Sequence, residues 1–166
     1  EEDLTAVTIV VEGLAEFRKT VPQGRPLLIH APVILSQDPS VWRRMLTIAR
    51  GTDDGVAKDD AVLWGAHFVG RIAEARASVS QIRLMTDTGF RIAAVVASAD
   101  ASRSPADRLT GILEGHGVDT CSLNWIPHDT RIEIGWPVVT AEDPLSNLPP
   151  SLILGRIGDV EPQAGQ

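Results

Sequence analysis

The segment at residues 51–72, GTDDGVAKDDAVLWGAHFVGRI, decides between a ligand-binding loop, a metal-binding loop and the turns of a β-protein. It contains four glycines and four aspartates, and its second half is largely apolar. A phosphate-binding loop needs glycines at fixed offsets and a following helix, whose N-terminus faces the anion. Here an alternating run with β-branched residues follows, which predicts a strand. An EF-hand calcium loop needs regularly spaced oxygen ligands and a distal glutamate, and both are missing. We therefore predict turns between strands, with a tight turn at Asp54-Gly55.

The rest of the chain after residues 22–26, PQGRP, carries the same kind of pattern. Short apolar runs alternate with turn residues about every ten positions, as in sandwiches and small barrels. The sequence therefore predicts an all-β fold. Further predicted strands are PLLIHAPVIL (26–35), MLTIAR (45–50), AVLWG (61–65), FVGRIAEA (68–75), RIAAVVAS (91–98), LTGILEG (109–115) and LILGRIGDV (152–160).

Strict alternation of apolar and polar residues predicts three half-buried strands. One is IRLMT (82–86). The second is CSLNWI (121–126), which would place Cys121, Leu123 and Trp125 on one side. The third is RIEIGWPV (131–138), with one face formed by Ile132, Ile134, Trp136 and Val138.

The first residues follow a helical pattern instead. Residues 3–21 place apolar side chains at alternating steps of three and four, the spacing of a coiled-coil seam, until Arg18 interrupts the series. We predict one amphipathic helix over residues 1–22. It would either associate with a second helix or pack on its own domain. The predicted self-association seam is Leu4, Val7, Val11 and Leu14.

Composition excludes some functions. The net charge is −7 and no patch of clustered lysine and arginine occurs, which argues against nucleic acid as a partner. Tyrosine is absent and aromatic residues make up 4% of the sequence, so few aromatic rings are available to stack on sugars or bases. No apolar run reaches the length of a membrane span. The first residue is Glu1, which suggests a shortened or processed form of a longer protein.

Candidate catalytic and metal-binding residues lack the partners that their chemistry needs. The four histidines, His30, His67, His116 and His128, could contribute to a triad. However, the sequence contains no Gly-x-Ser-x-Gly or Gly-Asp-Ser-Gly segment, which would form the turn that presents a nucleophilic serine. His116 lies between two glycines with no second metal ligand nearby. We interpret the single cysteine, Cys121, as a small core residue. We predict no catalytic residues, no metal and no cofactor.

The order and spacing of several segments resemble the extracytoplasmic β-domains of the MreC family, bacterial rod shape-determining scaffolds. The resemblance covers about Ala31 to Val160. It rests on DPSVWRRMLTIARGTDDGV (38–56), AVLWGAHFVGRI (61–72), VSQIRLMTD (79–87), GILEGHG (111–117), LNWIP (123–127), IGWPVVT (134–140) and LPPSLILGRIGDV (148–160).

This resemblance implies a non-catalytic scaffold of the cell-elongation machinery, built from two small β-barrels of trypsin-like topology. Residues 26–65 plus 126–161 would form the first barrel and residues 66–125 the second. The N-terminal helix would end a dimerising coiled coil and lead back to an inner-membrane span, with the barrels in the periplasm. The implied partners are a class B penicillin-binding protein, MreD and, through them, MreB. Homodimers or filaments are also implied.

Some residues depart from the pattern of the family. Gly135-Trp136-Pro137 replaces the usual Gly-Asp before a strand, and Thr140-Ala141-Glu142 replaces Thr-Ser-Gly after it. An interaction built on that turn is therefore not carried over.

Two other classes of protein remain open at this point. A periplasmic adaptor of an efflux or secretion system also joins helices to small β-domains, and its V-x-K-x-D-x-V turn resembles residues 56–62. Adaptors usually have a second helical arm, which the C-terminal tail does not supply. A degenerate trypsin-like enzyme would share the barrels and should react with a fluorophosphonate probe.

Overall fold

Strands and short turns make up the described part of the chain. The computed structural model describes residues 28–35, 43–97, 109–127, 132–142 and 148–161. These residues contain ten strands and a single turn of 3-10 helix, η1 (Thr52–Asp54). The all-β prediction is confirmed, whereas the predicted helix over residues 1–22 lies outside the described residues. The strands are β1 (Val33–Leu35), β2 (Met45–Ile48), β3 (Ala61–Trp64), β4 (His67–Ala75), β5 (Ser80–Leu84), β6 (Arg91–Val96), β7 (Leu109–Gly115), β8 (Cys121–Asn124), β9 (Pro137–Thr140) and β10 (Ile153–Arg156).

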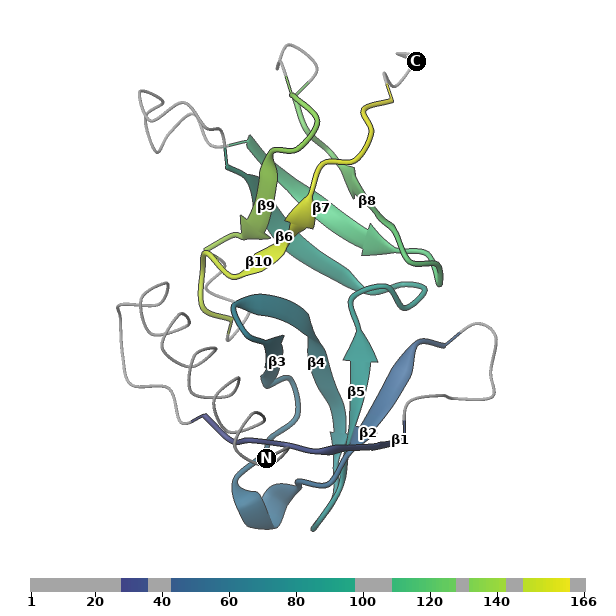
Figure 1. The fold of residues 1–166 in the computed structure, drawn as a ribbon, viewed down its shortest axis with the longest axis vertical. Helices are drawn as coiled ribbons and strands as arrows, with labels where there is room; N and C mark the ends of the chain where they lie inside the picture. The colour runs from purple at the N-terminus through teal and green to yellow at the C-terminus, as the bar shows by residue number, and fades with distance from the viewer. Residues whose placement is uncertain (1–27, 36–42, 98–108, 128–131, 143–147, 162–166) are drawn as a thin grey trace, which may run out of the picture.

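The ten strands hydrogen-bond into one sheet with the order β1-β2-β5-β4-β10-β9-β6-β7-β8, and β3 pairs with β4 beside this path. Every pair is antiparallel except β10 with β4, which meet at Ile153 and His67. Figure 1 shows β1–β5 in the lower half of the molecule and β6–β10 in the upper half. Among the described strands no pairing joins the two ends of the path. Two closed barrels of trypsin-like topology are therefore not confirmed.

The lower half is built on the alternation of strands β2, β4 and β5. In β4 the residues at alternate positions, Phe68, Gly70 and Ile72, are buried. Ile72 lies opposite Ile82 of β5, and Ile82 lies opposite Leu46 of β2. Side chains that lie opposite each other share one face of a sheet, so they form a continuous apolar row. With Ile48 and Val56, these isoleucines form one hydrophobic cluster.

The upper half surrounds a second and larger cluster. In β7 the residues at positions 109, 111, 113 and 115 are buried, as the alternation requires. Phe68 of β4 belongs to this cluster, and its ring centroid lies 6.0 Å from that of Phe90. Strand β4 therefore runs from one hydrophobic cluster to the other. The buried members are Phe68, Phe90, Ile92, Ala94, Leu113, Val138, Leu148, Leu152 and Leu154.

Strand pairing groups the chain differently from the predicted barrel boundaries. The boundary after residue 65 separates β3 from β4, which pair through four residues of each strand. The same boundaries separate β2 from β5 and β6 from β9, although both pairs are hydrogen-bonded. The observed groups are β1–β5 and β6–β10, joined by the contact of β10 with β4. The division of the chain into two barrels stays a prediction.

Strand β8 ends before the predicted alternation does. Cys121 and Leu123 pack against the larger cluster as predicted. Trp125, however, has φ of 65° and is 77% exposed. A Cβ built on Gly111 of β7 would lie 3.2 Å from Leu123 Cδ1 and 3.1 Å from Ile126 Cγ1. The side chains of Leu123 and Ile126 thus both cover Gly111. Because Ile126 takes the inward position, the backbone reverses at Trp125 and the indole turns outward.

The predicted strand over residues 131–138 is interrupted by a turn. Gly135 has φ of 90°, and the Trp136 N–H donates to Glu133 O at 3.3 Å. Strand β9 begins only at Pro137, and Val138 is buried while Ile134 is 68% exposed. The prediction that Ile134 and Val138 share one buried face is therefore wrong. A left-handed glycine reverses the chain between them.

The remaining predicted strands agree with the structure, with ends that differ by a few residues. Strand β7 has the predicted bounds, and β2, β3, β5, β6 and β10 lie inside or overlap the predicted runs. The run at 26–35 is the exception, because only Val33–Leu35 is a strand in its described part. Pro32 directly precedes β1, and proline cannot donate to a ladder.

Candidate interaction surfaces

The acidic loop at residues 51–55 closes on itself through its own hydrogen bonds. The Gly51 N–H donates to Asp54 Oδ2 at 3.0 Å, and the Gly55 N–H donates to Thr52 O at 3.0 Å. Gly55 has φ of 87°, in the left-handed region that favours glycine. The predicted tight turn at Asp54-Gly55 is confirmed. The carboxylate that would have served a metal instead caps its own turn.

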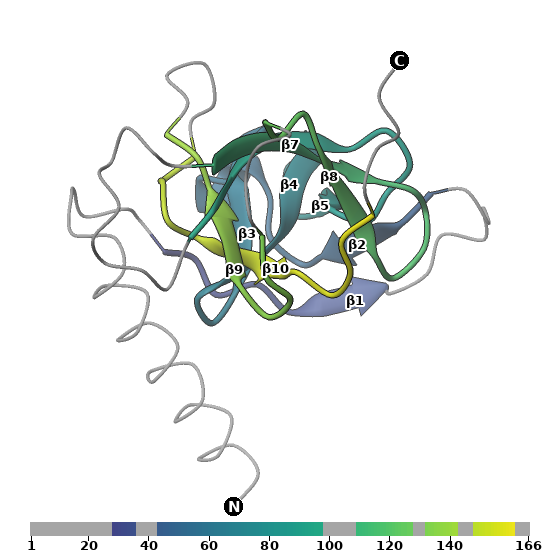
Figure 2. The same ribbon diagram turned by 90° about the horizontal axis from the view of Figure 1, so that it is seen from above.

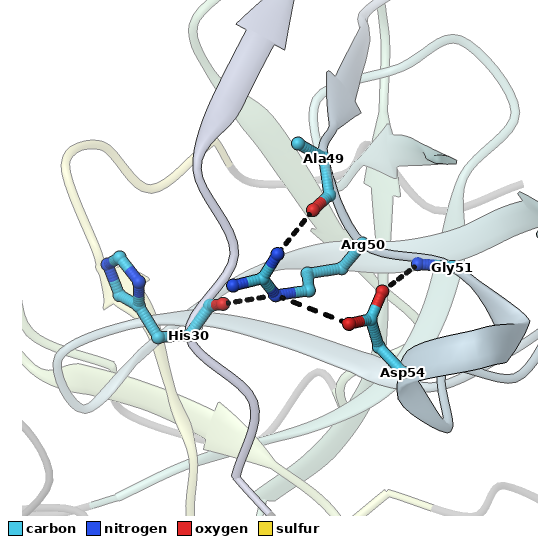
Figure 3. Close-up of polar contacts among 5 residues, drawn as sticks. All are labelled: His30, Ala49, Arg50, Gly51 and Asp54. Atoms are coloured by element: carbon cyan, nitrogen blue, oxygen red, sulfur yellow. Dashed lines mark hydrogen bonds and ion pairs between the residues drawn. The ribbon is translucent and has the colours of Figure 1, made fainter. Parts of the chain in front are cut away.

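An arginine uses the other oxygen of the same carboxylate (Figure 3). Arg50 Nε lies 3.7 Å from Asp54 Oδ1 and donates to His30 O at 3.1 Å. Arg50 Nη1 donates to Ala49 O at 2.9 Å. Arg50 thereby fastens the loop to the segment that precedes β1. His30 contributes its backbone carbonyl to this cluster, and its side chain is exposed.

The second aspartate pair forms another turn. Asp60 Oδ2 accepts from the Ala57 N–H at 2.8 Å, and the Asp59 N–H donates to Ile72 O at 2.9 Å. Asp59 has φ of 69°, a conformation that aspartate tolerates better than most residues. The glycines and aspartates of residues 51–60 thus shape the entry into β3.

Histidine and serine meet once in the described residues, on the outer side of β7 and β8. His116 Nε2 lies 2.7 Å from Ser122 Oγ, and Asn124 Nδ2 donates to the same oxygen at 3.2 Å. Ser122 lies within a strand, and the nearby Asp119 pairs with Arg44 at 3.6 Å. A serine nucleophile needs a carboxylate or similar group to orient its histidine. This dyad lacks one among the described residues. In the same residues no three histidine, cysteine, aspartate or glutamate side chains are placed to hold a metal ion.

Cys121 is a packed thiol. It lies against the larger hydrophobic cluster, and its Sγ donates to Met85 O at 3.5 Å. Desolvation by burial raises the pKa of this thiol. A raised pKa keeps the sulfur protonated, whereas a reactive cysteine needs the thiolate. Cys121 therefore packs against the core as a partly buried residue and is not one of its fully buried members.

The turn between β5 and β6 contains a buried carboxylate that the sequence reasoning missed. Asp87 is 2% exposed. Its Oδ2 accepts from the Arg44 N–H at 2.8 Å, and its Oδ1 lies 3.2 Å from Arg83 Nε. Arg44 Nε in turn donates to Gly117 O at 3.0 Å, and the Gly117 N–H donates to Thr86 O at 2.7 Å. These bonds join the lower strands to the loop between β7 and β8. The TDTGF segment signals a turn, but its long-range partners have no local signal.

Three described strands, β1, β3 and β8, pair on one side only. The unpaired side of such a strand presents backbone N–H and C=O groups to which another chain can bond. Figure 1 shows β1 in the lower half of the molecule and β8 in the upper half. Figure 2 shows the same strands from above. The open edges are thus distributed over both halves of the fold.

Large apolar side chains are exposed beside these edges. Trp64 ends β3 and is 75% exposed, and Trp125 directly follows β8. A tryptophan with left-handed backbone is unusual, because its Cβ crowds the backbone there. Exposed aromatic residues at open edges are typical of protein-binding surfaces. The others exposed among the described residues are Val33, Ile34, Ile112, Val118, Ile134 and Val160.

The predicted helix seam cannot be placed on this surface. Leu4, Val7, Val11 and Leu14 lie outside the described residues, so their role in self-association stays a prediction. Within the described ranges, no helix has the length and apolar character that a membrane crossing requires.

Comparison with solved structures places this fold beside MreC proteins. The crystal structure of MreC from Pseudomonas aeruginosa superposes with a TM-score of 0.73 at 21% identity, covering 85% of this chain and 85% of that one. A solved structure described as the major periplasmic domain from the cell shape-determining filament MreC gives a TM-score of 0.61. Its identity is 16%, and the match covers 76% of this chain and 74% of that one.

Sequence comparison agrees with the structures. The chain is 27% identical over 132 residues to the cell shape-determining protein MreC of Listeria monocytogenes, a match that covers 77% of this chain. It spans 42% of the length of that relative. The family model described as rod shape-determining protein MreC, barrel core, matches residues 34–166. This family consists of cell-shape proteins and not of enzymes. The chain belongs to the MreC family of rod shape-determining proteins.

Proposed function

We propose that this chain is the periplasmic part of a non-catalytic scaffold that positions peptidoglycan-synthesis proteins during cell elongation. The observation that carries the proposal is the match of the family model over residues 34–166. The name of one similar structure, the periplasmic domain of a cell shape-determining filament, supports the location and self-association. In this proposal the full-length protein is anchored to the inner membrane, and its β-domain is organised as two barrels.

The scaffold would act by offering surfaces for binding. Open strand edges supply main-chain hydrogen bonds, and exposed tryptophans supply apolar contact area. The edges of β1, β3 and β8, with Trp64 and Trp125 beside them, support this mode of action. The proposed partners are a class B penicillin-binding protein and MreD, and MreB indirectly. The helix seam Leu4, Val7, Val11 and Leu14 would hold a homodimer or filament together.

Recovery of partners from a bacterial envelope extract tests this function. The immobilised chain is expected to retain a class B penicillin-binding protein, identified by mass spectrometry and by labelling with a fluorescent penicillin. Recovery of efflux or secretion components without a transpeptidase would support the adaptor alternative instead. The matches reported above, which are all to MreC proteins, give that alternative no support.

Removal of residues 1–21 tests the helix separately. Sedimentation of the chain with and without this segment measures its contribution to self-association. A stronger association of the longer form is expected, and a monomer in both forms would refute the dimer seam.

A further inference from the structure

Two arginines lie directly opposite each other on neighbouring strands in the lower half of the fold. Arg71 of β4 is paired with Arg83 of β5. Side chains at opposite positions of an antiparallel pair project to the same face, and like charges at such positions destabilise the sheet. Ala61 of β3 lies opposite Arg71, and Met45 of β2 lies opposite Arg83. This row across four strands therefore contains two positive charges and no acid.

Both arginines project to the outer face of the sheet. Ile72 follows Arg71 and Ile82 precedes Arg83, and both isoleucines belong to the smaller hydrophobic cluster. Successive side chains of a strand point to opposite faces, so the arginines point away from this cluster. Arg83 is 48% exposed, whereas Arg71 is partly buried.

The backbone hydrogen bonds set the spacing of the two arginines. The Ile72 N–H donates to Asp60 O at 3.0 Å, so the backbone of Ile72 faces the segment before β3. The backbone of Arg71 therefore faces β5, and Arg71 and Arg83 form a hydrogen-bonded pair. Cα atoms in such a pair are about 5.5 Å apart. Two guanidinium groups that extend from this spacing to one face can reach the same small anion.

Arg83 has a carboxylate partner, and Arg71 has none. Arg83 Nε lies 3.2 Å from Asp87 Oδ1. Glu74 is the next acid along β4, but its Oε1 lies 2.9 Å from Arg76 Nε. Among the described residues, Arg71 takes part in no ion pair and in no side-chain hydrogen bond. One carboxylate thus serves two opposed guanidinium groups.

The guanidinium group of Arg71 is partly removed from water without compensation. Its Nε–H is buried and has no acceptor. Burial of a charged donor without a partner is costly, and water screens such a charge less than it screens an exposed one. The sequence therefore breaks two local rules at one place, with like charges opposite each other and an unpartnered buried donor. Such a departure without structural compensation is typical of a functional site.

We infer that Arg71 and Arg83 together bind an oxyanion, a phosphate or a carboxylate group, on the outer face of β4 and β5. The terminal N–H groups of both arginines donate to its oxygens, and Arg83 keeps its contact with Asp87. The anion offsets the repulsion between the arginines and supplies the counter-charge that Arg71 lacks. A planar guanidinium group suits both kinds of anion, because it donates two parallel N–H bonds.

The overall charge makes this pair stand out. The chain carries −7, so long-range electrostatics repel an anion. Binding must therefore come from the local pair of arginines. This site is separate from the strand edges and exposed tryptophans of the proposed scaffold function, and it does not depend on that function.

Titration with inorganic phosphate, and separately with acetate, tests the site. The pH and the ionic strength are held constant with chloride as the balancing anion, and the arginine Nε–H signals of the 15N-labelled chain are followed by NMR. The Arg71 and Arg83 signals are expected to shift together and to saturate with one dissociation constant. The control is Arg156, an exposed arginine of β10 that donates to Gly135 O, and its signal should not shift.

The two titrations also identify the chemical group. Tighter binding of phosphate would assign the site to a phosphorylated ligand, and tighter binding of acetate would assign it to a carboxylate. Absence of saturation with both anions would overturn the inference. An equal shift of the Arg156 signal would overturn it as well, because the anion would then not distinguish the pair from an isolated arginine.

Arg71→Met and Arg156→Met provide matched variants. Each removes one guanidinium group, and methionine keeps part of the aliphatic stem. Arg71→Met is expected to abolish the saturable shift at Arg83, and Arg156→Met should leave it intact. Saturation that persists in Arg71→Met would refute a shared site.

Urea-induced unfolding of the same variants separates binding from a structural role. At ten times the dissociation constant, the anion should raise the folding equilibrium constant of the wild type and of Arg156→Met about elevenfold. General stabilisation by phosphate is common to all variants, so only the difference between them counts. Without the anion, Arg71→Met should be at least as stable as the wild type, because it removes the repulsion and the unpartnered donor. A clear loss of stability would show that Arg71 is structural and would overturn the inference.

Discussion

Removal of the Asp87 carboxylate is expected to destabilise the protein strongly, although the side chain has no catalytic part. Asp87→Ala removes the acceptor of the Arg44 N–H, 2.8 Å away, at a site where the carboxylate is almost fully buried. A hydrogen bond to a charged group contributes about 1.5–3 kcal/mol. The ion pair with Arg83 adds about 0–1 kcal/mol, because the arginine side chain is 48% exposed. The expected loss is therefore about 1.5–4 kcal/mol, a large share of the 5–15 kcal/mol typical of a domain.

Urea-induced unfolding, followed by circular dichroism and tryptophan fluorescence, measures this loss. Asp119→Ala is the matched control, since Asp119 pairs with Arg44 of the same cluster but has a side chain that is 96% exposed. Its removal deletes the same charge without uncovering a buried donor, so the free energy of unfolding should not change. A loss below about 1 kcal/mol for Asp87→Ala would refute the reasoning. So would equal losses for the two variants, because burial would then not decide the effect.

Three further substitutions test local features. Gly51→Ala should lower the free energy of unfolding by about 3 kcal/mol or more, because the added Cβ would lie 2.0 Å from Arg76 O. Gly158→Ala is the control, because a Cβ at Gly158 meets open space and should leave the free energy of unfolding unchanged. Equal effects of the two substitutions in urea titrations would contradict the predicted clash at Gly51. The Trp125→Gly protein should be more stable than the Trp125→Ala protein by about 1 kcal/mol, because residue 125 has φ of 65° and glycine adopts this left-handed conformation without strain. The opposite order of stability in thermal unfolding would exclude left-handed backbone strain at this residue. Burial raises the pKa of Cys121, so its contribution to stability is present at neutral pH and lost as pH rises above about 8.5. Wild type should therefore lose more stability than Cys121→Ala between pH 8 and 10 in urea titrations, and parallel curves would contradict this.

Short apolar runs bounded by turn residues were sufficient to predict most strands. The LTGILEG run gave β7 with its bounds, because its buried and exposed positions alternate without interruption. The GTDDG turn was predictable as well, since aspartate and glycine have specific roles in tight turns. Both features depend on residues that are neighbours in sequence.

The misplaced features depend on residues that are far apart in sequence. Trp125 was predicted to lie on the same side as Cys121 and Leu123, but Ile126 occupies the space over Gly111 of another strand. Asp87 gave no signal because its partner Arg44 lies 43 positions away. The pairing of β6 with β9 had no local signal for the same reason. Periodicity along one segment does not report which strands that segment meets.

Direct binding to a purified transpeptidase tests the scaffold account most directly. Sedimentation velocity is measured for the chain, for the periplasmic ectodomain of a class B penicillin-binding protein from the same bacterium, and for their mixture. The account predicts a faster boundary in the mixture that contains both proteins. Independent sedimentation of the two proteins at every concentration ratio would contradict it.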